Sequence, residues 1–205
     1  MVKNIIFDLG NVVLKLKWKL VIERYTNNIE EINLLQNVIF NSQEWLQLDE
    51  GTISKPDALE IMISKLPTNL HDICKNITDN WNDALVINDE IINFIIDIRK
   101  QGYKTYILSN ASLELPGFLK SKKLDQYFDG KIISAEEKLL KPDYRIYDVL
   151  LKRFNLIPEE CLFLDDRKEN IDAAINMGIN GYVFDYNNYP QFLKDIEKYN
   201  IYVNI

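Results

Sequence analysis

The chain has 205 residues, of which 47% are hydrophobic and 27% charged, a balance that excludes intrinsic disorder and allows one sizeable core with a small accessory unit. Only seven glycines and six prolines are present, and no apolar run approaches the roughly 20 residues of a membrane helix, so fibrous and membrane-spanning classes are excluded. The net charge of −7 argues against a nucleic-acid partner, and we expect a cytoplasmic globular protein.

Five short apolar runs predict buried strands, and most of them end at polar residues. The first run is Lys3–Phe7, and the others are Tyr103–Leu108, Lys131–Ser134, Cys161–Leu164 and Gly181–Phe184. Segments with helical spacing alternate with these runs, at Asp89–Lys100, Ser112–Lys122, Asp143–Phe154, Lys168–Met177 and Tyr189–Tyr199. This alternation predicts an α/β fold with a Rossmann-like parallel sheet of about five strands, covered by helices on both faces.

Residues 15–87 interrupt the alternation. They show helical spacing of apolar residues and no convincing strand, and Ser54 followed by Pro56 and Asp57 is typical of a helix start. We therefore expect residues 1–14 and 88–205 to form the α/β core, with residues 15–87 inserted after the first strand as an all-helical cap. Because the insert leaves after the first strand and returns before the second, it should stand over the carboxyl ends of the strands.

Several polar residues fall directly after predicted strands, where open parallel sheets bind their ligands. Asp8 follows the first strand, Ser109 and Asn110 follow the second, and Asp165 and Asp166 follow the fourth. An aspartate at a strand end suits nucleophilic attack on a phosphate ester, although Asp8 alone is equally consistent with a turn or helix cap. Adjacent carboxylates at positions 165 and 166 repel unless a cation relieves them, and a helix N-terminus would explain one of them.

Four ordered motifs resemble those of the haloacid dehalogenase superfamily. They are F-D-L-G-N-V-V at Phe7–Val13, L-S-N at Leu108–Asn110, K-P-D-Y-R-I-Y at Lys141–Tyr147 and F-L-D-D-R-K-E-N at Phe163–Asn170. Within the superfamily they look like the branch that contains bacterial α-D-glucose-1-phosphate phosphatase. Each motif alone is weak, but four in order across nearly the whole chain form a specific signal.

The resemblance implies a nucleophile and a metal site. Asp8 would attack phosphorus, form an aspartyl-phosphate intermediate and bind Mg²⁺ through its second oxygen. Asp166 would be the direct or near-direct metal ligand and Asp165 a supporting one. Gly10, two residues after the nucleophile, would give its backbone carbonyl to the metal.

The resemblance also implies a phosphate site. Ser109 and Asn110 would hold phosphoryl oxygens through the hydroxyl and nearby backbone N–H groups. Lys141 would offset the charge that Asp8 and the phosphate share. Lys138 is the neighbouring alternative, and the proline that follows Lys141 favours Lys141.

The chain departs from the superfamily pattern at Gly10. Most phosphatases of the superfamily have an aspartate there, which acts as general acid and then as general base, a contribution of about 10²–10⁴-fold. Three explanations stay open: water or the cap supplies the proton, the substrate has an easily expelled leaving group, or the chain catalyses poorly.

A cap segment, Leu48–Ser54, has the position of the superfamily's substrate-specificity loop. Gly51 permits a sharp turn that would direct Glu50 and Thr52 toward the cleft, where a hydroxyl and a carboxylate would suit a sugar. A plain connection between two helices is the alternative interpretation.

These features predict a Mg²⁺-dependent phosphomonoester hydrolase that acts on a small phosphorylated metabolite, with a sugar phosphate as the favoured substrate class. One alternative is a weakly catalytic module that binds a phosphorylated ligand, which the glycine at position 10 motivates. A metal-independent dehalogenase is the other, and the acidic pair Asp165 and Asp166 argues against it because it would repel an anionic haloacid.

Overall fold

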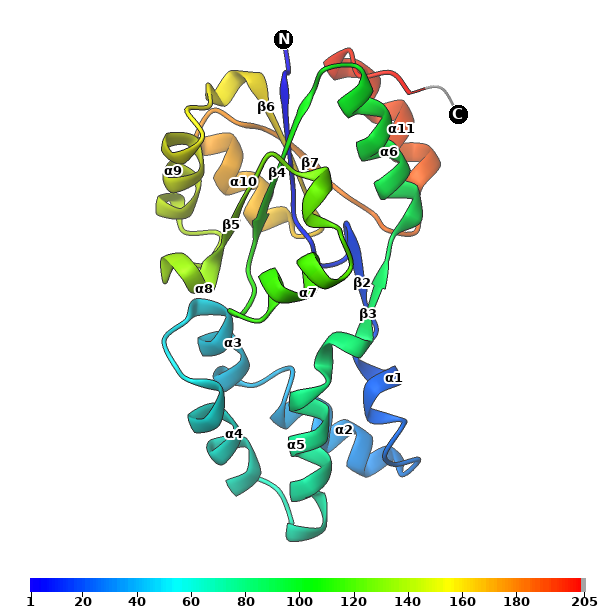
Figure 1. The fold of residues 1–205 in the computed structure, drawn as a ribbon, viewed down its shortest axis with the longest axis vertical. Coiled ribbons are helices and arrows are strands. Elements are labelled where there is room, and N and C mark those ends of the chain that lie inside the picture. The colour runs from blue at the N-terminus through cyan, green and yellow to red at the C-terminus, as the bar shows by residue number, and fades with distance from the viewer. Residues whose placement is uncertain (204–205) are drawn as a thin grey trace.

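A computed structural model describes residues 1–203 and contains the predicted parallel sheet. Five strands lie in the order β5-β4-β1-β6-β7, and all four neighbouring pairs run parallel (Figure 1). Their bounds are β1 Asn4–Phe7, β4 Lys104–Ser109, β5 Gly130–Ile133, β6 Cys161–Asp165 and β7 Asn180–Val183. The first strand along the chain is thus central, so that the residue after it lies in the middle of the sheet edge.

Helices cover both faces of the sheet, as predicted. Side chains of a strand alternate between faces, so Ile5 and Phe7 pack on one side with α6 (Asp89–Lys100), α7 (Leu115–Ser121) and α11 (Tyr189–Ile196). Ile6 packs on the other side with α9 (Tyr144–Arg153) and α10 (Lys168–Asn176). Both sides of β1 are therefore buried, which explains its uninterrupted apolar sequence.

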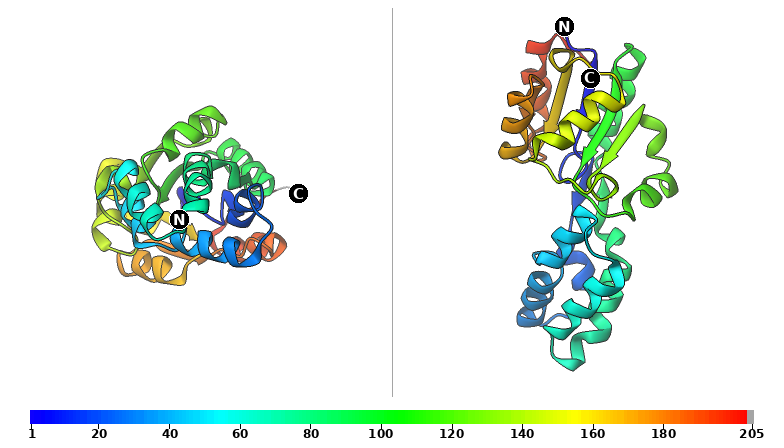
Figure 2. Two further views of the ribbon diagram at one scale, coloured as in Figure 1. Left: turned by 90° about the horizontal axis from the view of Figure 1, so that it is seen from below. Right: turned by 90° about the vertical axis from the view of Figure 1, so that its left-hand side faces the viewer.

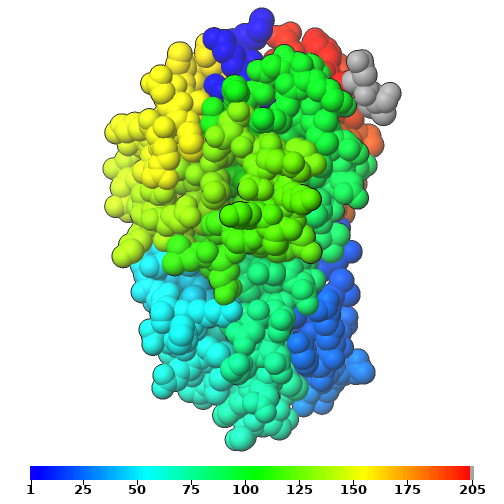
Figure 3. Space-filling model, viewed as in Figure 1, coloured from blue at the N-terminus to red at the C-terminus, as the bar shows by residue number. Residues whose placement is uncertain are grey.

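The remaining long helices form a separate layer beyond the carboxyl ends of the strands (Figures 1 and 2). We call this layer the cap; its helices are α1 Trp18–Ile22, α2 Ile29–Val38, α3 Gln43–Glu50, α4 Lys55–Ser64 and α5 His71–Asp79. In the space-filling view the cap, coloured blue to teal, lies directly against the core (Figure 3). Short α8 (Ser134–Glu137) of the core packs against α3.

Helix starts in the cap follow the side-chain chemistry of the sequence. Ser54 accepts a hydrogen bond from the N–H of Asp57 and caps α4, as its sequence predicts. Asn28 caps α2 and Ser42 caps α3 in the same way. The apolar spacing of the cap predicts helices at Leu16–Tyr25, Ile29–Phe40, Ala58–Leu66 and Leu70–Trp81 only. It does not predict α3, whose exposed positions Gln43 and Leu46 obscure the helical pattern.

Two short strands connect the cap to the core. β2 (Leu14–Leu16) and β3 (Leu85–Ile87) pair antiparallel where the chain enters and leaves the cap. The prediction that residues 15–87 contain no strand is therefore wrong at the two ends of that segment. The neighbouring Asn88 strengthens the junction, because its side chain donates to the carbonyl of Val12.

Among residues 1–203, no helix is long and apolar enough to cross a membrane. Both cysteines, Cys74 and Cys161, are buried free thiols.

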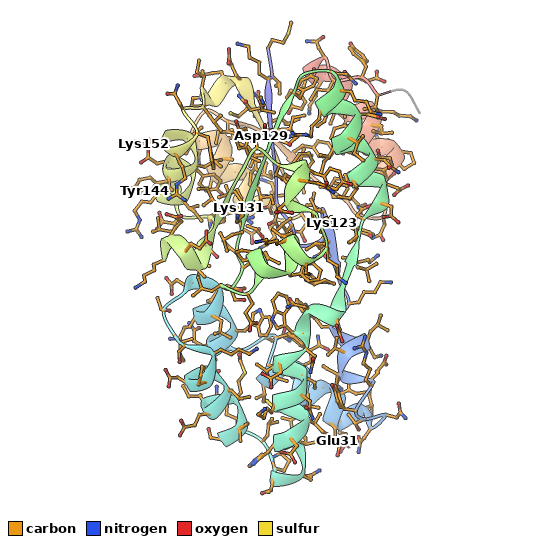
Figure 4. The ribbon with its side chains drawn as sticks, in the orientation of Figure 1. Glu31, Lys123, Asp129, Lys131, Tyr144 and Lys152 are labelled. Atoms are coloured by element: carbon orange, nitrogen blue, oxygen red, sulfur yellow. The ribbon has the colours of Figure 1, made fainter. Side chains whose placement is uncertain are left out.

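One partly exposed carboxylate joins the strands at the outer edge of the sheet, with 20% of its side chain accessible. Asp129, at the amino end of β5 (Figure 4), accepts hydrogen bonds from the backbone of Thr105 and from Arg99. The ammonium of Lys104 lies 3.0 Å away. Burial alone would raise the pKa of Asp129, but the backbone N–H and the two cations hold it below its usual value.

We predict that Asp129→Asn lowers the free energy of unfolding by about 0.5–1 kcal/mol at neutral pH, because solvent screens its partly exposed ion pairs. A carboxyl with a lowered folded pKa stabilises the fold above its unfolded pKa of about 3.9 and loses that contribution as the pH falls through the folded value. The difference between variant and unaltered chain should therefore shrink below about pH 4. Urea unfolding at several pH values measures it, and a constant difference across that range would contradict the assignment.

Candidate active site

The carboxyl ends of the central strands converge on one buried ammonium group. Lys141, in the loop before α9, is 3% exposed. Its Nζ lies 2.9 Å from Asp8 Oδ1 and 2.7 Å from Asp165 Oδ2. It also donates to the carbonyl of Leu108 at 2.9 Å. Lys141 therefore joins the ends of β1, β4 and β6 at a single point.

Asn110 holds the backbone of Lys141. Its Oδ1 accepts from the N–H of Lys141 at 2.8 Å, and its Nδ2 donates to the carbonyl of the same residue at 3.0 Å. The predicted phosphate contact of Asn110 uses the backbone N–H groups of this loop and stays a prediction. The structure gives the side-chain amide a separate role in positioning the lysine, across 31 positions of sequence that no local pattern connects.

Asp165 is fully enclosed by donors. Its carboxylate accepts from Lys141, from Asn170 Nδ2 at 2.9 and 3.0 Å, and from the N–H of Arg167 at 2.8 Å. The neighbouring Asp166 is less buried and accepts from Asn11 Nδ2 at 2.9 Å. The two adjacent carboxylates thus differ, and Asp166 keeps more of its oxygen lone pairs for another partner.

Asp8, Asp165 and Asp166 form a group of carboxylates that suits a metal ion. One oxygen from each lies within 4.8 Å of the others. Burial raises the pKa of Asp8 to about 6, with Lys141 opposing and Asp165 adding to the rise. Burial also raises the pKa of Asp166. Three carboxylates thus face one ammonium, and an all-oxygen set with excess negative charge fits Mg²⁺.

A small cavity lies between the core and the cap, lined by the residues that directly follow Asp8 and the end of β4. It has a volume of about 110 Å³, and its core walls include Gly10 and Ser109. The cap contributes all three of its tryptophans, Trp18, Trp45 and Trp81, and one carboxylate, Asp49. Trp45 and Trp81 pack edge to face at 5.5 Å, so the cap side of the cavity is a rigid aromatic wall.

The cap residues that the sequence singled out lie elsewhere. Thr52 Oγ1 donates to Glu50 Oε2 at 3.2 Å, and neither residue lines the cavity beside Asp8. Asp49 lies there instead, because α3 continues through Glu50 and its helical phase decides which side chain faces the core. Trp45 and Asp49 are four residues apart, so a prediction of α3 would have placed both on the same face of that helix.

The geometry defines a hydrolase-type α/β core with an acidic site at the carboxyl edge of its sheet. A family model for haloacid dehalogenase-like hydrolases matches residues 2–178, and the chain belongs to that family.

The chain is also similar to individual proteins over most of its length. It is 25% identical to a sesquiterpene phosphatase of Aspergillus oryzae over 87% of this chain and 88% of that protein. It is 24% identical to the D-ribitol-5-phosphate phosphatase of Bacteroides thetaiotaomicron over 87% and 89%. A family enzyme of the same bacterium, crystallised as a magnesium complex, superposes with a TM-score of 0.71 at 23% identity, covering 90% and 94%.

We predict that Mg²⁺ raises the thermal unfolding midpoint of the unaltered chain, because a cation relieves the repulsion among Asp8, Asp165 and Asp166. At a hundredfold excess over its dissociation constant, the ion should add about 2.7 kcal/mol to the free energy of unfolding. Asp166→Asn should abolish most of that gain, whereas Asp172→Asn, at an exposed position of α10, should retain it. An equal Mg²⁺ effect in all three proteins would contradict the site.

Proposed function

We propose that this protein is a phosphomonoester hydrolase in which Asp8 is the nucleophile. The observation that carries the proposal is the buried contact of Asp8 with Lys141 at the edge of a cavity large enough for a phosphate group. The family assignment supports a hydrolase. The names of two relatives, both phosphatases, support a phosphate ester as the bond that is hydrolysed.

In the first step an oxygen of Asp8 forms a bond to phosphorus as the bond from phosphorus to the ester oxygen breaks. This step gives an aspartyl phosphate, and the leaving oxygen gains a proton to become the released alcohol. Water then forms a bond to the same phosphorus and loses a proton, the acyl phosphate bond breaks, and inorganic phosphate leaves Asp8 free again. Lys141 counters the negative charge near the nucleophile in both steps, because its ammonium is held within hydrogen-bonding distance of Asp8.

Ser109 and the metal would act on the phosphoryl oxygens. The hydroxyl of Ser109, at the end of β4, lines the cavity beside Gly10 and would donate to one of these oxygens. Asp8, Asp166 and the carbonyl of Gly10 would hold Mg²⁺, with Asp165 in support, and the bound ion would supply positive charge that stabilises the transferring group.

We further propose that the substrate is a small hydroxyl-bearing phosphate ester, with sugar phosphates as the favoured class. A second cavity of about 220 Å³ adjoins the first and shares Trp45 and Trp81 with it. A 150 Å³ apolar cavity is enough for a benzene-sized molecule, so this one accommodates a group of five or six carbons.

An unpaired polar atom in that second cavity favours a sugar over a hydrocarbon. Ser112 lines it, and its Oγ is buried without a hydrogen-bond partner among the described residues. A hydroxyl of the substrate would give that oxygen a partner, a gain of about 1 kcal/mol, whereas a hydrocarbon would leave it unpaired as it is now. The D-ribitol-5-phosphate phosphatase among the relatives supports a polyol phosphate as the substrate. The sesquiterpene phosphatase is a reason to compare it with an isoprenoid phosphate.

The first test is phosphate release from a panel that contains α-D-glucose 1-phosphate, pentose and pentitol phosphates, an isoprenoid phosphate and p-nitrophenyl phosphate, with Mg²⁺ or with chelator. We expect metal-dependent release from the unaltered chain. Asp8→Asn should lower it at least about a thousandfold with the fold retained, because an amide is no nucleophile toward phosphorus. Circular dichroism checks the fold.

Other outcomes identify the alternatives. Tight phosphate-ester binding without release would indicate a phospholigand-binding module, and full activity on a haloacid in chelator would indicate a dehalogenase. Release that survives Asp8→Asn would exclude the proposed nucleophile.

We also predict that Ser112→Ala lowers kcat/KM for the preferred sugar phosphate by about five- to tenfold, the value of one lost hydrogen bond of about 1 kcal/mol or slightly more. The same change should leave kcat/KM for p-nitrophenyl phosphate, which lacks a hydroxyl, within about twofold. Steady-state kinetics on both substrates measure the split, and an equal loss on both would contradict the assigned contact.

A further inference from the structure

The proposed reaction requires a proton donor that the core does not supply. An alkoxide leaves phosphorus readily only when it is protonated as the bond breaks. Gly10 has no side chain, Lys141 already has three hydrogen-bond acceptors around its ammonium, and Asp165 is saturated by donors. The donor must therefore come from another part of the cavity wall.

Asp49 is the only carboxyl among the described residues that line the cavity beyond the Asp8 cluster. It lies in the last turn of α3 and faces the same space as Gly10 and Ser109. The rest of the cap wall is tryptophan and leucine. A leaving group that extends from the phosphate toward the cap would pass beside this carboxyl.

Contacts with the core hold Asp49 in place. Its backbone carbonyl accepts from the hydroxyl of buried Ser134, and Ser134 Oγ accepts from the N–H of Ala111 at 2.8 Å. Its carboxylate accepts a hydrogen bond from the backbone of Ser112. Gly51 then turns the chain away with φ of 73°, and a Cβ there would collide with the backbone of Ala135. The position of the carboxyl is thus fixed relative to the core loops.

The surroundings of Asp49 favour its protonated form. Burial raises its pKa to about 7, the Ser112 N–H opposes the rise, and the charge of Asp8 adds to it. On α8, which packs against α3, Glu137 is neutralised by Arg153 at 2.6 Å, and Glu136 is exposed. Near neutral pH such a carboxyl is present in both its protonated and its ionised form. A group that acts first as an acid and then as a base needs both forms.

We propose that Asp49 is the general acid and then the general base of the reaction, contributed by the cap. The inference rests on the proposed phosphatase function. Protonated Asp49 transfers its proton to the ester oxygen as the bond from phosphorus to that oxygen breaks and Asp8 binds phosphorus. The Asp49 carboxylate then takes a proton from water as the water oxygen binds phosphorus and Asp8 is released, which restores both side chains.

The test compares Asp49→Asn with the unaltered chain on a sugar phosphate and on p-nitrophenyl phosphate. The sugar alkoxide needs a proton, so we expect a 10²–10⁴-fold loss in turnover of the sugar ester. The nitrophenolate leaves without a proton, so its first turnover should fall by less than about tenfold. Hydrolysis of the aspartyl phosphate still needs a base, so nitrophenol should appear as a burst of one equivalent of enzyme before a slow steady state.

Three further proteins control the comparison. Asp72→Asn, at an exposed position of cap helix α5, should behave like the unaltered chain. The asparagine at position 49 keeps an oxygen that accepts the Ser112 N–H, so the fold should persist. If circular dichroism shows otherwise, Asp49→Ser serves in its place.

The third control restores an acid from the core side. A Cβ at Gly10 would lie 3.4 Å from Leu16 and 3.9 Å from Asp8 Oδ2, so it meets no clash there. We expect the double variant Gly10→Asp with Asp49→Asn to hydrolyse the sugar phosphate at least about tenfold faster than Asp49→Asn alone.

Equal losses on both substrates without a burst, or no loss on the sugar phosphate, would overturn the role of Asp49 while the phosphatase stands. Absence of phosphate release from the unaltered chain with every ester would instead overturn the proposed function, and this role with it.

Discussion

The site depends on one buried ion cluster, in which the ammonium of Lys141 lies between Asp8 and Asp165. Removing three charges from water is costly, and such clusters seldom add net stability. The contact fixes geometry instead: it connects the ends of β1, β4 and β6, and Asn110 holds the lysine backbone with two further hydrogen bonds. Because every partner comes from the edge of a rigid parallel sheet, the carboxylate of Asp8 is oriented before any ligand arrives.

The cap completes this site from the opposite side, through few but directional contacts. Ser134 of the core reaches the last turn of α3, and α8 packs against the same helix. Three tryptophans fill most of the cap wall next to the cavity, which leaves little space for bulk water around a bound ester. The core therefore holds the charged side chains of the site, and the tryptophans of the cap enclose the cavity next to them.

The sequence predicted the core well because its signals are local. Most strands contain a short apolar run that ends at a polar residue, and each motif occupies a few consecutive positions, as in Phe7–Val13. The cap was predicted less well. Helix α3 was not predicted because polar and exposed apolar residues interrupt its helical pattern. As a result, the sequence pointed to Glu50 and Thr52 as the cap residues that face the cleft, and not to Asp49. The Asn110 contact with Lys141 joins residues 31 positions apart, and no local pattern encodes such a pairing.

A proton donor on the cap has a consequence that a donor beside Asp8 would not have. The carboxyl of Asp49 reaches the cavity only while α3 rests on the core, where Ser134 and the Ser112 backbone hold it. Proton transfer to the leaving group is then available only when the aromatic wall is also in place. Enclosure of the ester and activation of its leaving group thus become one event, and a cap displaced from the core would leave Asp8 exposed to ligands without the acid needed to release an alkoxide. Gly10 fits this arrangement, because an acid at that position would remain with the core whatever the position of the cap.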